Sequence, residues 1–319
     1  MIVALDRPAL TGVLTQWTLQ PLAILVAVLL AGAYVVGVRR LDVPWSRGRS
    51  AVFALGLALL VWTSCGFPGV YARSLFWVWT SQTLILWLLV PITLLFGHPI
   101  QLALAVQGPD GRLARIVASK PVQIVSNPLV GPALVPILSF VVFFGPVPAW
   151  SIRTPAVGWA LQLALVLIGA MMVLALVGLE DDVSSLAVAL GLAIGSIELV
   201  LDAVPGLVMR LHETLVTSYF TERANFSWTP TALHDQRIAG ATLWCIAELI
   251  DLPFLYLVFR RWLRVDARDA ATVDAVLEAE RHARVALSPG DEHTLVPPDR
   301  DAPWWLSDPS MQQRLRRRE

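Results

Sequence analysis

The sequence has few charged residues and a single lysine, and both shortages narrow what the protein can be. Charged side chains make up 15% of the 319 residues, and Lys120 is the lysine. An ordinary soluble domain carries about 25% charged residues. A nucleic-acid-binding surface is built from clusters of lysine and arginine along one face. The composition therefore excludes an ordinary soluble domain, and we expect no nucleic-acid partner.

Cysteine is also scarce. Cys65 and Cys245 lie in different apolar stretches and form no C-x-x-C motif, which excludes a zinc ribbon and a thioredoxin-like site. We expect two buried, unreactive thiols, with a disulfide or a copper site as the alternative. The sequence also lacks a phosphate-binding glycine loop, a G-x-S-x-G elbow and an H-E-x-x-H zinc motif. We therefore expect a protein that is not an enzyme.

Long apolar stretches dominate what is present, since hydrophobic residues make up 56% of the chain. An α-helix needs about 20 residues to cross a hydrocarbon core of roughly 30 Å. Backbone polar groups find no water there, so each span should be helical. The sequence predicts an all-α polytopic membrane protein with a bundle of seven transmembrane helices, near residues 17–37, 51–66, 75–96, 130–147, 156–178, 185–209 and 239–260.

The arginines are unevenly divided between the two sets of helix ends. Loops rich in lysine and arginine stay in the cytoplasm. With seven spans, this rule places the N-terminus outside and the C-terminus in the cytoplasm of the plasma membrane. The basic set is Arg39, Arg40, Arg47, Arg49, Arg112, Arg115, Lys120, Arg260, Arg261, Arg264 and Arg268, and the opposite set is Arg73, Arg153, Arg210, Arg223 and Arg237.

The connection from Leu211 to Gln236 is the longest one on the predicted outer side. It holds Tyr219, Phe220, Phe226 and Trp228, aromatic residues that suit the membrane interface. We therefore expect an ordered outer cap and not a free linker.

The C-terminal part changes character twice, which predicts three domains. A transmembrane domain covers residues 1–264, a cytoplasmic helical extension covers 265–287, and a disordered tail covers 288–319, where proline, aspartate and glycine accumulate. Trp304 and Trp305 precede an arginine-rich end of the tail. Such a pair suits either the inner membrane surface or a groove on a partner protein.

Four carboxylates fall inside predicted spans: Glu198, Asp202, Glu248 and Asp251. Glu198 and Asp202 are four residues apart and therefore share one helix face. Because consecutive spans run in opposite directions, Asp202 and Glu248 come to similar depths. Intramembrane acids usually face a bundle interior or a water cavity. Two interpretations are open, a route for a cation or protons and neutral acids that hydrogen-bond to neighbouring helices.

The order of several residues resembles one family over most of the chain. The series begins with Tyr71-Ala72-Arg73-Ser74-Leu75-Phe76, and continues with Gln82, Pro91, Gly169, Trp228, Asp235, Gln236, Gly240, Trp244 and Glu248. It is similar to the CtaG-type cytochrome c oxidase assembly factors of bacteria. That resemblance implies a seven-span fold in the bacterial plasma membrane and an association with copper delivery to heme-copper oxidases. Within the series, we expect Asp235 to cap the start of its own helix, since an aspartate there accepts hydrogen bonds from free N–H groups.

The chain departs from this family at the histidines. The family's H-x-x-x-H pair falls at Trp79 and Thr83, and two further histidines fall at Ala164 and Asp202. Tryptophan, threonine and alanine provide no copper ligand. The metal-ligating side chains left in the predicted outer half are Cys65, Asp202, Met209, His212, Cys245 and Glu248.

The resemblance implies a membrane-embedded assembly or scaffolding factor for a respiratory heme-copper oxidase, without the usual histidine metal site. Copper is the one cofactor that it raises. The expected partners are the lipid bilayer and oxidase subunits or other assembly factors, with Trp304 and Trp305 as a binding motif. The alternative function is a copper or proton pathway along the four intramembrane carboxylates.

Overall fold

The described part of the computed structural model is built from helices, and it covers residues 5–9, 11–41, 43–108, 111, 115, 119–120, 130–177 and 185–286. The elements in order are α1 (Gly12–Thr15), α2 (Pro21–Arg39), α3 (Arg47–Cys65), α4 (Phe67–Tyr71), α5 (Phe76–Leu84), the π-helix η1 (Ile85–Leu89), α6 (Val90–Phe96), α7 (Pro99–Gln107), α10 (Val130–Phe143), α11 (Val147–Arg153), α12 (Pro155–Val177), α13 (Ser185–Leu211), α14 (Tyr219–Glu222) and α15 (Ala232–Ala286).

Several helices are long and apolar enough to cross a membrane. Among the described residues they number five: Pro21–Arg39, Arg47–Tyr71, Phe76–Phe96, Pro155–Val173 and Leu192–Leu211. They coincide with five of the predicted spans, so the membrane character of the chain is confirmed. The other two predicted spans fall on α10, which has 14 residues, and on part of α15. The total of seven spans stays a prediction.

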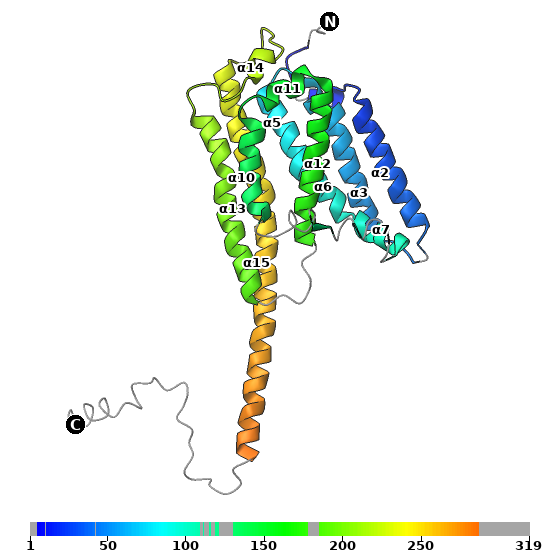
Figure 1. Ribbon diagram of the computed structural model, residues 1–319, viewed down its shortest axis with the longest axis vertical. Helices are drawn as coiled ribbons and strands as arrows, with labels where there is room; N and C mark the ends of the chain where they lie inside the picture. Colours follow the sequence, from blue (N-terminus) through cyan, green and yellow to red (C-terminus); the bar gives the residue numbers. More distant parts are fainter. Residues whose placement is uncertain are drawn as a thin grey trace, which may run out of the picture. The chain divides into compact units, whose positions relative to one another are not determined.

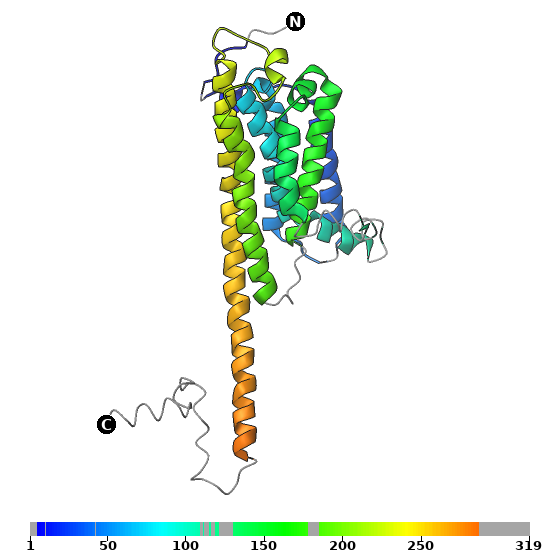
Figure 2. The ribbon, with the colours of Figure 1, turned by 60° about the vertical axis from the view of Figure 1, so that its left-hand side comes forward.

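One continuous helical segment, α5–η1–α6, is at the centre of the packing. It contacts α3 on one side and α12 on the other, while α2 packs on α3 and α10 packs on α13 (Figure 1). Phe76, Trp87 and Val90 on this segment are almost completely buried. The second view shows the same arrangement of neighbouring helices (Figure 2). Phe76, Gln82 and Pro91, which belong to the family series, are buried on this segment.

The π-helical turn in this segment has a local cause in Pro91. Proline has no N–H, and its ring collides with the carbonyl four residues earlier, which here belongs to Trp87. The chain widens into a π turn just before it, and π turns are rare and occur mostly as such single turns inside α-helices. On α12, a Cβ placed on Gly169 would collide with the Trp87 carbonyl oxygen, so this glycine lets α12 approach the exposed backbone. Pro91 and Gly169 thus form one packing unit.

The chain divides into two compact units, Met1–Leu263 and Arg264–Glu319. In the second unit, residues 264–286 are helical, and apolar side chains such as Val273 and Val276 are exposed. The predicted domain boundaries stay a prediction, and the predicted disordered tail at 288–319 lies outside the described residues.

Helices α13 and α15 approach closely through a pair of glycines. A Cβ on Gly206 would lie 2.8 Å from the Gly240 carbonyl oxygen and 2.8 Å from the Trp244 nitrogen. A Cβ on Gly240 would lie 2.6 Å from the Arg210 nitrogen. Small residues at such crossings allow two backbones to touch inside a membrane. A side chain at either glycine would push these helices apart.

We expect Gly240→Ala to destabilise the protein, because the new methyl group meets backbone that cannot rotate away. Overpacking of this kind costs about 1–3 kcal/mol. Thermal unfolding of the detergent-purified protein measures it. Gly32→Ala in α2 is the matched control, since a Cβ there meets nothing within 4 Å. Equal midpoints for the two variants would contradict the assigned helix contact.

Candidate functional site

The segment that joins α13 to α15, residues 212–231, is ordered and is called the cap below. The Tyr219 hydroxyl is buried and donates to the Ala72 carbonyl oxygen at 2.7 Å, and the Ala224 N–H donates to the Arg73 oxygen at 2.8 Å. Trp228 donates its indole N–H to the Leu5 oxygen at 2.8 Å. The cap therefore connects the N-terminal segment with the loop before α5 and with α15. The segment is ordered as expected, and its place on the outer side stays a prediction.

Asp235 lies at the centre of these connections. Its side chain is fully buried, and its Oδ2 and Oδ1 accept hydrogen bonds from the backbone N–H groups of Phe76 at 2.9 Å and Trp77 at 3.1 Å. Arg223 in the cap donates to Oδ2 at 2.7 Å, and its other terminal nitrogen donates to the Pro230 oxygen at 2.9 Å. One carboxylate thus joins the start of α5, the cap and α15.

The expectation that Asp235 caps its own helix is wrong. Asp235 lies in the first turn of α15, and its carboxylate instead accepts from the first two N–H groups of α5, 158 and 159 residues away in sequence. Those N–H groups have no partner within α5, because the first turn of a helix leaves its donors free. The partial positive charge of a helix N-terminus also favours a carboxylate there.

Burial has opposing consequences for this site. Loss of water raises the pKa of the Asp235 carboxyl above its ordinary value, and the N–H groups of Phe76 and Trp77 and the guanidinium of Arg223 offset this rise only in part. The Tyr219 hydroxyl has a pKa well above its ordinary value, chiefly because it is buried and then because Asp235 is near. The donors around Asp235 suit its ionised form, and Tyr219 stays neutral.

Gln236, the next residue, makes a second set of bonds from α15 to the cap. Its Nε2 donates to the oxygens of Met209 at 3.3 Å and Thr214 at 3.0 Å, and its Oε1 accepts from the Val216 N–H at 2.9 Å. The side chain is fully buried. The Asp235-Gln236 pair therefore fixes both ends of the connection between α13 and α15.

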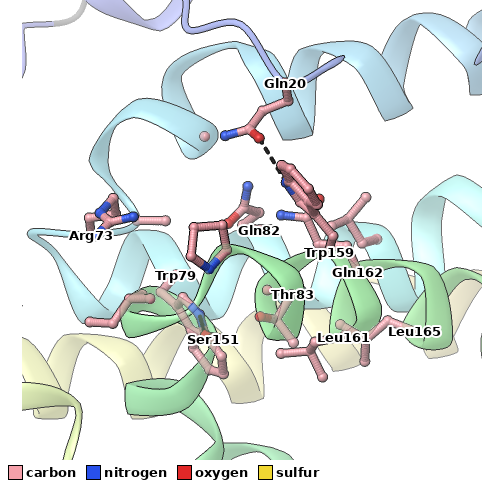
Figure 3. A pocket seen from close by; sticks show the side chains of 16 residues that line it. Gln20, Arg73, Trp79, Gln82, Thr83, Ser151, Trp159, Leu161, Gln162 and Leu165 are labelled. Atoms are coloured by element: carbon pink, nitrogen blue, oxygen red, sulfur yellow. Dashed lines mark hydrogen bonds between the residues drawn. The ribbon is translucent and has the colours of Figure 1, made fainter. Parts of the chain in front are cut away.

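Trp79 and Thr83, the two positions at which the family resemblance implies histidines, lie on α5. Trp79 is 4% exposed, stacks with Phe76 at 5.7 Å between ring centroids, and donates its indole N–H to the Ser151 hydroxyl at 3.0 Å. Both residues line a cavity of about 270 Å³ between α5 and α12 (Figure 3). Ala164 is exposed on α12. The position at which the resemblance implies the first histidine is therefore filled by the Trp79 indole, which packs on Phe76 and hydrogen-bonds to Ser151.

Gln82, between these positions, is buried and donates from Nε2 to the Thr63 oxygen at 3.0 Å. Trp244, another residue of the family series, is 40% exposed. Its indole N–H reaches Glu248 Oε1 at 3.3 Å.

The metal-ligating side chains predicted from the sequence are dispersed. Cys65 is buried at the end of α3, whereas Cys245 is exposed on α15, so the expectation of two buried thiols is wrong for Cys245. Met209 is buried in the core, and His212 is exposed beside Thr214. Within the described ranges, no group of three or more His, Cys, Asp or Glu residues could hold a metal ion.

The four acids that the sequence places within predicted spans are described in part. Asp202 is 7% exposed on α13, and Glu248 is partly buried on α15. The side chains of Glu198 and Asp251 lie outside what the structure describes, as do residues Trp304 and Trp305.

Sequence reasoning missed Arg223 as part of the site. It lies outside any periodic pattern, and only its position inside an aromatic segment twelve residues before Asp235 could have drawn attention to it. The side chain is 6% exposed, and its guanidinium lies 5.2 Å from the Phe220 ring centroid. A buried arginine needs a fixed counter-charge, which Asp235 provides.

Comparison with known proteins identifies a family. The profile of the cytochrome c oxidase caa3 assembly factor family, Caa3_CtaG, matches residues 32–265. The chain belongs to this family. The match includes the π turn, the cap and the Asp235-Gln236 pair, so the features described above lie within the family's shared region.

Curated relatives occur in mycobacteria. Uncharacterised proteins of Mycobacterium bovis and Mycobacterium tuberculosis are each 25% identical over 284 residues, and one of Mycobacterium leprae is 24% identical over 279. These matches cover 84% of this chain but 42% of each relative, so the chain spans less than half the length of these proteins. No solved structure matches the chain.

We expect Asp235→Asn to destabilise the protein strongly, because it leaves the Arg223 guanidinium buried without a counter-charge. Breaking a buried pair in this way costs about 3–5 kcal/mol. Thermal unfolding in detergent measures the loss.

Glu222→Gln is the control for that variant. Glu222 pairs with Arg153 at 3.8 Å, and the Arg153 side chain is 60% exposed. Such a surface pair contributes at most about 1 kcal/mol. Losses of similar size in the two variants would show that Asp235 does not hold the cap.

Proposed function

We propose that this chain is a membrane-embedded assembly factor for a caa3-type heme-copper oxidase and that it works through protein contacts, without a histidine-held metal. The observation that carries the proposal is the packing at Trp79. Its indole fills the position where the family resemblance implies the first histidine, and it packs on Phe76, Phe143 and Tyr219. This place has become part of the hydrophobic core.

The residues present do not fit copper at the family's histidine positions. Copper sites in proteins use thiolate, thioether or imidazole ligands, and Cu(I) favours the sulfur ligands. Trp79, Thr83 and Ala164 offer none of these groups. We therefore assign no metal-dependent step to this chain, and no catalytic reaction.

The proposed orientation follows the arginine distribution, with the N-terminus outside and the C-terminus in the cytoplasm. In that orientation the cap faces outward and residues 264–286 extend on the cytoplasmic side. Both could contact oxidase subunits or other assembly factors, and Trp304 and Trp305 add a cytoplasmic binding motif. The ordered backbone of the cap supports a recognition role, since preorganised loops lose less entropy on binding.

A strain that lacks this chain should assemble less caa3-type oxidase, measured as intact complex on native gels and as spectroscopic heme a signal. Wild-type and Trp79→Phe chains should both restore assembly, because phenylalanine keeps the apolar packing and, like tryptophan, binds no metal. Added copper should leave the deletion strain unrepaired. Full repair by copper alone would overturn the metal-independent proposal.

The second candidate function is a copper or proton pathway past the intramembrane acids. The register of α13 and α15 supports it. Gly240 lies against Arg210, Trp244 against Gly206 and Leu255 against Gly195, with residue numbers that rise in one helix as they fall in the other. The same antiparallel register puts position 202 level with position 248. Glu198 and Asp251 lie within one turn of these positions along the sequence.

The double variant Asp202→Asn/Glu248→Gln separates the two functions, because it removes both charges and keeps the side-chain shapes. A pathway predicts at least a tenfold loss of proton or copper flux into proteoliposomes, while scaffolding predicts normal oxidase assembly. Asp266→Asn, a change at an exposed position of α15, is the control. Unchanged flux in the double variant would eliminate the pathway.

A further inference from the structure

The cavity beside Trp79 has a wall of polar groups and one cation, and no carboxylate. Its polar lining includes Arg73, Gln20, Gln82, Gln162 and Ser151, and neither aspartate nor glutamate is among the lining residues (Figure 3). Arg73 has no carboxylate partner among the described residues. Arg73 is exposed at the edge of the cavity, and a guanidinium placed there without a carboxylate partner favours an anionic ligand.

The position of the cavity along the spans identifies the source of that anion. Gln20 directly precedes the span Pro21–Arg39, and Arg73 lies between the span that ends at Tyr71 and the one that begins at Phe76. Pro155, which also lines the cavity, is the first residue of the span Pro155–Val173. The cavity is therefore level with the ends of the spans, where lipid headgroups lie.

Exposed tryptophans at the same end mark the same level. Trp17, Trp150 and Trp159 are 54%, 48% and 37% exposed, and each lies within a few residues of an end of a span or in α11. Tryptophan gathers at the membrane–water interface, where its ring contacts lipid and its N–H stays near polar groups. Trp159 lines the cavity itself, so the hollow borders the headgroup region directly.

The hydrogen-bonding groups in the cavity are oriented by the protein. Gln20 Oε1 accepts from the Trp159 indole N–H at 3.2 Å, which leaves Gln20 Nε2 as a donor. Gln82 Nε2 donates to the Thr63 oxygen, and within the described part of the chain its Oε1 accepts no hydrogen bond. Gln82 is 6% exposed, so this acceptor is held rigidly in the wall. The cavity thus offers donors for a phosphate and an acceptor for a hydroxyl.

We propose that this cavity binds the headgroup of an anionic phospholipid whose headgroup carries hydroxyls, as phosphatidylglycerol does. Arg73 binds the phosphate, Gln20 and Gln162 donate to its oxygens, and Gln82 accepts from a headgroup hydroxyl. Leu86, Leu161 and Leu165 line the apolar part of the cavity, against which the glycerol carbons pack. Phosphatidylcholine fits less well, because its headgroup has no net charge and no hydroxyl.

Native mass spectrometry of the detergent-purified full chain tests the proposal, with phosphatidylglycerol or phosphatidylcholine added at defined concentrations. Wild-type protein should retain phosphatidylglycerol preferentially. Arg73→Gln should weaken that binding by about tenfold or more, since hydrogen bonds to charged groups are the strong ones. Arg153→Gln is the matched control, because Arg153 is an exposed arginine on α11 outside the cavity lining.

Gln162→Leu provides a second variant that keeps the charge and tests the cavity independently of Arg73. It should weaken phosphatidylglycerol binding severalfold, with an unchanged elution volume in size-exclusion chromatography as the check on folding. Equal losses in Arg73→Gln and Arg153→Gln would assign the binding to general surface charge and overturn the proposal. Binding of inorganic phosphate as tight as the binding of phosphatidylglycerol would overturn the lipid as the ligand.

Discussion

The arrangement of this end of the bundle depends on the hydrogen bonds that the Asp235 carboxylate accepts. Its three donors come from α5 and the cap, and its own backbone belongs to α15. Removing a carboxylate from water is costly, and it persists only where charge-assisted hydrogen bonds replace the lost hydration. Two helix N–H groups and one guanidinium meet that requirement here. The cap therefore has a single geometry relative to α5 and α15.

That constraint extends to the neighbouring side chains. Tyr219 in the cap donates a hydrogen bond to the Ala72 carbonyl oxygen and contacts the rings of Trp79 and Phe76. Gln236 accepts a hydrogen bond from Val216 on the other side of the cap. Trp79 can pack as it does because the cap and α5 are held together. The same packing that occupies the family's first histidine position forms one wall of the cavity at the ends of the spans. The core around Trp79 and the wall of the cavity thus belong to one packing arrangement.

Hydropathy predicted most of the membrane-spanning helices but did not predict the contacts of the site. Five of the predicted spans coincide with apolar helices, because the requirement for a continuous apolar surface acts on each helix alone. The residues Asp235 and Gln236 were also singled out from sequence, through the family series. The assigned role of Asp235 was wrong, since local capping rules consider the nearest helix and the actual donors begin another one. Arg223 was missed for the same reason, and Cys245 was expected inside the bundle although it lies on its surface.

The sequence by itself determined that this is a membrane protein of helices and that it belongs with oxidase assembly factors. Only the tertiary structure decided which helix start Asp235 satisfies, that the Trp79 indole packs in the core, and that Arg73 and three glutamines meet around one cavity. The physical reason is distance along the chain. Hydropathy and helix length are properties of neighbouring residues, whereas the bond between Asp235 and Phe76 joins groups 159 residues apart and exists only once the helices have packed.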